Sequence, residues 1–136
     1  MSPTGNGKTI LVAEDELQVR TFVRSMLRDS GYQVLVAVDG LDALEVARKH
    51  TGPIHLLLSD VEMPRMTGVE LATQLQNERP ETQVLLMSGM TSGMLVLNEG
   101  WQFLPKPFMV HMLKVRVHHL LGDGPPIPTP PPEDQD

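Results

Sequence analysis

The sequence predicts an α/β protein built on a doubly wound sheet of five parallel strands, with helices on both faces. Five short apolar runs alternate along the chain with segments in which apolar residues recur every three or four positions. Within each run neighbouring residues are apolar, which is typical of strands that helices cover on both faces. The chain of 136 residues, 40% of them hydrophobic, is long enough to bury one such core.

The five apolar runs are the expected strands. They lie at 9–13, 34–38, 54–58, 84–87 and 101–104. A helical pattern follows each run, so the chain is expected to consist of five strand–helix units.

The helices are expected where apolar residues recur with helical spacing and end signals flank them. Gly31 is the expected end of the first helix, and Asp39 is the expected N-cap of the second. The third begins with a capping box formed by Thr67 and Glu70. A weak fourth helix is expected within 91–99, before a last amphipathic one. The apolar positions of the four stronger helices are Val19, Phe22, Val23, Met26 and Leu27; Leu41, Leu44 and Ala47; Leu71, Ala72 and Leu75; and Val110, Leu113, Val117, Leu120 and Leu121.

The composition changes at both ends of the chain, which predicts one domain over 8–122. Residues 1–7 are polar and glycine-rich, as in a short flexible lead. Residues 123–136 are rich in proline and end in acidic side chains. Proline has no amide donor, so this tail is expected to stay extended or disordered. A linker is the favoured interpretation of the tail, and a proline-rich ligand is the alternative.

Composition argues against several classes of protein. The formal net charge of −6 disfavours a nucleic-acid surface that depends on net positive charge. The absence of cysteine excludes a disulfide framework and a thiolate metal or redox site. The sequence has no apolar run near the roughly 20 residues that span a bilayer and no secretory signal, so a cytoplasmic protein is expected.

Charged and hydroxyl side chains follow the apolar runs. They are Glu14, Asp15 and Glu16 after the first run, Asp60 after the third, Ser88 after the fourth and Lys106 after the fifth. In a parallel sheet these positions share the edge where ligands bind. Two carboxylates about 4 Å apart repel by roughly 4 kcal/mol at an effective dielectric of about 20, so something must offset them. Mg²⁺, which prefers oxygen ligands, and the Lys106 amine meet that need.

An acidic pocket of this kind can accept a phosphoryl group. Asp60 is the expected nucleophile because it is central in the sheet and faces Lys106, and a carboxylate that attacks phosphorus forms an aspartyl phosphate. Mg²⁺ and Lys106 would stabilise the charge of the transferring group. Ser88 would donate a hydrogen bond to a phosphoryl oxygen.

Four motifs on this scaffold resemble those of the response-regulator receiver domain of bacterial two-component signalling. They are ILVAEDE at 10–16, LLSDVEMPRMTG at 57–68, LMS at 86–88 and FLPKPF at 103–108. One such motif is a weak signal, but four in family order on a matching scaffold are specific. The resemblance covers nearly all of 8–121, and it implies the flavodoxin-like receiver fold for the domain at 8–122.

The resemblance also implies a chemistry. Asp60 would accept a phosphoryl group from the phosphohistidine of a histidine kinase or phosphotransfer protein, or from a small phosphodonor. Mg²⁺ would be held by Asp15, Asp60 and the backbone carbonyl of Glu62, with Glu14 acting through water. The domain would not be an enzyme acting on another substrate, although it would assist its own phosphorylation and dephosphorylation.

A switch is implied as well. Ser88 would move onto the phosphoryl group, and Phe103 would turn inward to fill the space left behind. The altered surface would be recognised by a downstream protein of unknown identity, or by a second copy in a homodimer. Nucleic acid and membranes are not expected as direct partners.

Three features depart from the family pattern. Glu14 stands where the family usually has an aspartate, which keeps the charge but lengthens the side chain. Glu62 lies two residues after Asp60, where its charge bears on the lifetime of a phosphoryl group. The segment between Ser88 and Lys106 is short, which predicts a short or irregular fourth helix.

Other interpretations of the sequence carry different functions. The chain could be an interaction module of the same fold that works without phosphorylation, or a receiver fragment of a hybrid histidine kinase. An enzyme on this fold is disfavoured, because the acidic residues after the first strand would repel the phosphate of a flavin. A phosphatase of the haloacid dehalogenase type would have its nucleophile after the first strand and not the third.

Overall fold

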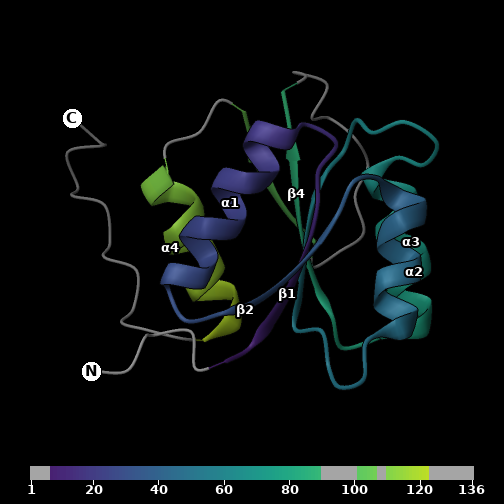
Figure 1. Ribbon diagram of the computed structural model, residues 1–136, viewed down its shortest axis with the longest axis horizontal. Coiled ribbons are helices and arrows are strands. Elements are labelled where there is room, and N and C mark those ends of the chain that lie inside the picture. The colour runs from purple at the N-terminus through teal and green to yellow at the C-terminus, as the bar shows by residue number, and fades with distance from the viewer. Residues whose placement is uncertain (1–6, 90–100, 107–109, 123–136) are drawn as a thin grey trace.

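The computed structural model describes residues 7–89, 101–106 and 110–122 (Figure 1). In chain order the elements are β1 (Thr9–Ala13), α1 (Leu17–Asp29), β2 (Gln33–Ala37), α2 (Gly40–Lys49), β3 (Leu56–Asp60), α3 (Gly68–Glu78), β4 (Gln83–Ser88), β5 (Gln102–Pro105) and α4 (Val110–Leu121). The helix expected within 91–99 lies outside the described residues, as do the tail at 123–136 and most of the N-terminal lead.

The five strands form one parallel sheet in the order β2-β1-β3-β4-β5. Helices α1 and α4 cover one face and α2 and α3 cover the other, as the two sides of the sheet in Figure 1 show. The predicted doubly wound α/β fold is therefore confirmed. The direction of winding reverses between β1 and β3, and in such sheets the carboxyl ends of these two strands border the ligand-binding crevice.

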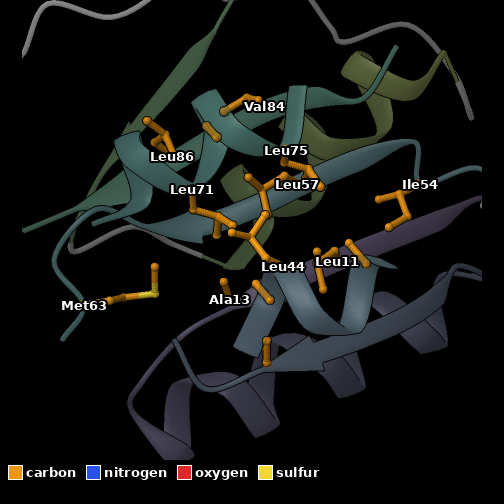
Figure 2. Close-up of a cluster of buried hydrophobic side chains, with 14 of the residues drawn as sticks. Leu11, Ala13, Leu44, Ile54, Leu57, Met63, Leu71, Leu75, Val84 and Leu86 are labelled. Atoms are coloured by element: carbon orange, nitrogen blue, oxygen red, sulfur yellow. The ribbon is translucent and has the colours of Figure 1, made fainter. Parts of the chain in front are cut away.

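The core has two layers because successive residues of a strand point to opposite faces of the sheet. Leu11 and Leu57 belong to the layer under α2 and α3, together with Leu44 and Leu71 (Figure 2). Ile10 belongs to the layer under α1 and α4. A slip of one residue between strands would exchange the layers, so the buried leucines hold the register and with it the height of each strand end.

Four of the five strands, β2 to β5, differ by one or two residues at their ends from the apolar runs that predicted them. β2 ends at Ala37, and Val38 beyond it is exposed. β3 begins at Leu56 and continues through Ser59 and Asp60, which pair with β4 although their side chains are polar. Strand pairing uses backbone groups, so a polar strand end is missed when only apolar runs are considered.

The predicted signals at the helix ends are confirmed. The Asp39 carboxylate accepts a hydrogen bond of 2.8 Å from the backbone N–H of Asp42 at the start of α2. Thr67 and Glu70 form the reciprocal capping box of α3. Gly31 follows α1 with a φ of 99°, in the left-handed region that favours glycine. Among the described helices, none combines the length and apolar character needed to cross a bilayer.

Phe22 was expected on the apolar face of α1, and this prediction is wrong. Its side chain is 51% exposed, whereas Val23 and Leu27 are buried. Consecutive residues of a helix point about 100° apart, so Phe22 lies at the edge of a face centred between Val23 and Met26.

Replacing Leu27 by alanine tests this assignment of the buried face. Leu27→Ala is expected to lower the free energy of unfolding by about 2–5 kcal/mol, since it removes a fully buried side chain. Phe22→Ala on the same helix is expected to change it by no more than about 0.5 kcal/mol. Urea denaturation measures both values, and a larger loss for Phe22→Ala than for Leu27→Ala would contradict the observed packing.

Gly68, at the start of α3, lies against the end of β3, and its N–H donates to the carbonyl of Val61 at 2.9 Å. A Cβ atom at this position would lie 2.3 Å from the backbone oxygen of Asp60. Gly68→Ala is therefore expected to lower the free energy of unfolding by about 1–3 kcal/mol. Gly89→Ala is the control, since its Cβ would come no closer than 3.8 Å to Lys106. Equal effects of the two changes in urea denaturation would contradict this close approach.

Candidate functional site

Three carboxylates meet at the carboxyl edge of the sheet. Glu14 and Asp15 directly follow β1, and Asp60 ends the neighbouring strand β3; each offers one oxygen, and these oxygens lie within 4.8 Å of one another. The parallel pairing of Ala13 with Ser59 brings the two strand ends side by side. Glu14 and Asp60 are buried and Asp15 is exposed. The structure thus brings together Glu14, Asp15 and Asp60 of the acidic residues that the sequence singled out, whereas Glu16 is exposed and is not part of the cluster.

The amine of Lys106 lies against this acidic cluster. Its Nζ donates to Oδ2 of Asp60 at 3.0 Å and lies 3.6 Å from Oε1 of Glu14. Burial lowers the pKa of Lys106, but the hydrogen bond and charge of Asp60, with the charge of Glu14, more than offset that effect and leave the pKa raised. Burial also raises the pKa of Asp60, and Lys106 only partly opposes the rise. The amine therefore stabilises the ionised Asp60 without cancelling the cost of burying it.

Glu14 has the least favourable surroundings of the three acids. Its side chain is fully buried, and Oε2 accepts a hydrogen bond of 3.0 Å from the backbone N–H of Glu16. Among the described residues, Oε1 has no hydrogen-bond partner. Burial, together with the charges of Asp60 and Asp15, raises the pKa of Glu14 to about 7, against the Glu16 N–H and the Lys106 amine, which lower it. A cation placed beside Oε1 would stabilise the ionised form of this buried carboxyl.

Glu62 connects the end of β3 with the end of β4. Its backbone N–H donates to Oδ1 of Asp60 at 3.1 Å, and its side-chain Oε2 accepts a hydrogen bond of 2.8 Å from Oγ of Ser88. The backbone carbonyl of Ser88 in turn accepts from the N–H of Lys106 at 2.7 Å. The sequence marked Glu62 as a charged neighbour of the site, but nothing in its spacing indicated the bond to Ser88.

The loop between β3 and α3 is tied to the start of α2. Arg65, with a φ of 72°, places its guanidinium against Oδ2 of Asp39 at 2.9 Å from Nε and 2.5 Å from Nη2. The Asp42 N–H and then the Arg65 guanidinium lower the pKa of Asp39, against its burial. The Met66 side chain contacts Gly40 so closely that a Cβ there would lie 2.7 Å away. Sequence analysis missed Arg65, because a positive φ and an ion pair to another loop leave no local signal.

Phe103 lies on β5, where it pairs with Leu86 of β4. Its side chain is partly buried and packs against the core layer under α2 and α3. Phe103 therefore lies next to the strand that ends in Ser88, and its role as a switch residue stays a prediction.

Comparison with known proteins identifies the family of this chain. Residues 10–118 match the family model of the response regulator receiver domain. The chain belongs to this family. It is therefore a receiver domain of two-component signalling, and the recognition of the family from four motifs is confirmed.

Several curated proteins and solved structures resemble this receiver domain. The sensor kinase CckA of Brucella abortus is 33% identical over 117 residues, a stretch that covers 83% of this chain and 12% of the kinase. The response regulator MprA of Mycobacterium leprae is 35% identical over 116 residues, covering 82% of this chain and 50% of the regulator. The chain thus spans half or less of the length of these two relatives.

Solved structures agree with the fold. The receiver domain of the hybrid histidine kinase CckA is 38% identical, with a TM-score of 0.73, and the match covers 83% of this chain and 98% of that one. The response regulator TrrA of Thermotoga maritima, solved in complex with Mg²⁺ and beryllium fluoride, is 27% identical with a TM-score of 0.75. That match covers 84% of this chain and 99% of TrrA.

The raised pKa of Glu14 predicts a stability that falls as pH rises. At a pH below 4.5, the usual pKa of glutamate, the Glu14 carboxyl is protonated in both the folded and the unfolded chain. Its burial then does not lower the free energy of unfolding. Between 4.5 and about 7 only the unfolded chain releases the proton, so the free energy of unfolding drops; above 7 the loss is complete. The shift from 4.5 to about 7 corresponds to about 3 kcal/mol.

Glu14→Gln removes this titration. In buffer free of divalent cations, the variant is expected to gain stability over the wild type between about pH 5 and about pH 8, by up to about 3 kcal/mol. Urea denaturation at several pH values measures the difference. Glu16→Gln, an exposed neighbour, is the control. Parallel pH profiles for the wild type and Glu14→Gln would contradict the assignment.

Proposed function

We propose that this receiver domain accepts a phosphoryl group on Asp60 from the phosphohistidine of a histidine kinase or phosphotransfer protein, and that this changes a surface bound by a partner. One observation carries the proposal. Asp60 ends the central strand β3, with the Lys106 amine 3.0 Å from one carboxylate oxygen and the acidic cluster beside it. A nucleophile with a cation on one side and a metal-like ligand set on the other suits phosphoryl transfer.

The acidic cluster fits a divalent cation. Its donors are all oxygens, and Oε1 of Glu14 is a buried acceptor without a hydrogen-bond partner in the described part of the chain. Such a set suits Mg²⁺, which uses one or two carboxylates and keeps several waters. Asp15, Asp60 and the backbone carbonyl of Glu62 would hold Mg²⁺ directly, with Glu14 acting through water. The ion would supply positive charge beside the phosphoryl oxygens.

The chain's own residues perform the remaining work. One carboxylate oxygen of Asp60 attacks phosphorus, the P–N bond of the phosphohistidine breaks, and the imidazole leaves with the electron pair. The Lys106 ammonium offsets the charge on the transferring oxygens. Ser88 then donates its hydroxyl hydrogen to a phosphoryl oxygen, and Phe103 turns inward beside it.

The same geometry bears on the wider role of the domain. It supports phosphorylation and dephosphorylation of the domain itself, without turnover of a separate substrate. The similarity to MprA and to the CckA receiver is compatible with a response regulator and with the receiver of a hybrid kinase. On this proposal the domain acts in the cytoplasm, and a downstream protein or a second copy of the chain recognises its phosphorylated state.

Phosphorylation with acetyl phosphate tests the acceptor. The wild type, incubated with acetyl phosphate and Mg²⁺, is expected to gain the mass of one phosphoryl group, and Asp60→Asn to gain none. Asp29→Asn, an exposed aspartate at the end of α1, should behave like the wild type. Intact-protein mass spectrometry measures the gain, and modification of Asp60→Asn to the wild-type extent would refute the assignment.

Removal of one cluster carboxylate tests the metal site. Asp15→Asn is expected to weaken Mg²⁺ binding at least about tenfold, because it removes a charged ligand from the site. Glu16→Gln changes the same net charge at an exposed side chain next to the cluster and is expected to bind nearly as the wild type does. Isothermal titration calorimetry with MgCl₂ compares them, and equal affinities for Asp15→Asn and the wild type would exclude Asp15 as a ligand.

A further inference from the structure

The Glu62 side chain accepts the hydrogen bond of the Ser88 hydroxyl, which the proposed switch needs for the phosphoryl group. Oγ of Ser88 donates to Oε2 of Glu62 at 2.8 Å, while the backbone N–H of Glu62 donates to Asp60. A serine hydroxyl carries a single hydrogen. It can be donated to the Glu62 carboxylate or to a phosphoryl oxygen on Asp60, but not to both.

We infer that Glu62 is a built-in competitor of the phosphoryl group, which holds Ser88 in its unphosphorylated position and so sets how completely phosphorylation switches the domain. The inference rests on the proposed function, in which Ser88 must reach the phosphoryl group. Glu62 is thereby a positioning residue that acts on Asp60 chemistry through Ser88.

Both partners of this hydrogen bond are held in place. The neighbours of Glu62 in the chain, Val61 and Met63, are buried, and its own N–H is bound to Asp60. The backbone of Ser88 is held by strand pairing in β4 and by the bond from the N–H of Lys106. The backbone therefore places a carboxylate within reach of the serine before any phosphoryl group arrives. A hydrogen bond to an ionised acceptor is about twice as strong as a neutral one, so releasing it has a measurable cost.

Charge adds to the competition. A phosphoryl group on Asp60 brings negative charge next to Glu62, so the Glu62 carboxylate must give up Ser88 and also move away. Both effects oppose the phosphorylated state. They differ in one respect, because only the hydrogen-bond effect requires the Ser88 hydroxyl, and this difference makes the inference testable.

Beryllium fluoride with Mg²⁺, the combination bound by TrrA, serves as the probe of the phosphorylated state. Calorimetry with the full chain measures its affinity for the wild type, Glu62→Ala, Glu62→Gln, Ser88→Ala and the double variant Glu62→Ala/Ser88→Ala. Glu62→Ala is expected to bind about tenfold more tightly than the wild type, as the loss of a competing hydrogen bond to a charged group implies. Glu62→Gln keeps a neutral acceptor and is expected to gain about threefold.

The double variant separates the two effects. If Glu62 acts through Ser88, then Glu62→Ala gains clearly less affinity in the Ser88→Ala background than with Ser88 present, because only the charge effect remains there. An equal gain in both backgrounds would show plain charge repulsion and overturn the inference, as would an unchanged affinity of Glu62→Ala. The Glu62 side chain is exposed, so Glu62→Ala and Glu62→Gln should both fold. If Glu62→Ala does not fold, Glu62→Gln with and without Ser88→Ala gives the same comparison.

Failure of the proposed function has a different signature. Asp60→Asn is the control, and it is expected not to bind the probe. If the wild type also fails to bind, or if Asp60→Asn binds equally well, the phosphoacceptor role and the inference fall together. If binding depends on Asp60 but not on the Glu62–Ser88 pair, only the inference falls.

A second readout needs no ligand. Release of Ser88 in free Glu62→Ala shifts the population of the domain toward its activated form. The amide NMR signals of Gly89 and Lys106, which flank Ser88 in the chain and by hydrogen bond, should therefore move along the line from the free to the beryllium fluoride-bound wild type. Movement in another direction, or none, would overturn the inference.

Discussion

The ion pair between Lys106 and Asp60 is the interaction on which the rest of this site depends. It crosses the sheet edge from the end of β5 to the end of β3, over a distance of 3.0 Å between Nζ and Oδ2. Without it, burial and the charge of Glu62 would both favour protonation of the Asp60 carboxylate. A protonated Asp60 could not act as the proposed nucleophile. The amine therefore favours the ionised form of Asp60, yet burial keeps the pKa of Asp60 raised, so the edge retains an attraction for a further cation.

The fold tolerates these buried, mutually repelling charges at the sheet edge because its stability comes from the apolar core. The two apolar layers on either side of the sheet contain the leucines of every central strand, and they hold the register that aligns the strand ends. Charged groups can then be kept close together at one edge, as functional sites often are at some cost in stability. Arg65 adds a second restraint, since its bond to Asp39 fixes the loop that carries Glu62. The backbone of Glu62 is in this way held between the acceptor and the serine.

Sequence reasoning reached most of the fold and the main members of the site. The end signals at Asp39, Thr67 and Gly31 were sufficient because each acts within a few residues of chain, where short-range geometry is decisive. The prediction for Phe22 was wrong because residues at the margin of an apolar face are placed by the neighbouring helix and strands and not by spacing alone. Asp60 was expected at the end of a buried strand, and it does end β3, although Ser59 and Asp60 lie outside the apolar run and pair with β4 through backbone groups.

The order of residue types along the chain was enough to establish the parallel α/β architecture, the edge at which its chemistry lies and the family to which the domain belongs. Alternation of apolar runs and helical spacing determines which faces must be buried, and a parallel sheet brings its strand ends to one edge whatever the loops contain. Only the folded molecule decided that Oε1 of Glu14 has no hydrogen-bond partner in the described part of the chain, that Arg65 reaches Asp39 and that Glu62 accepts from Ser88. These contacts join side chains whose positions depend on distances between separate loops, and no local pattern of residues encodes such distances.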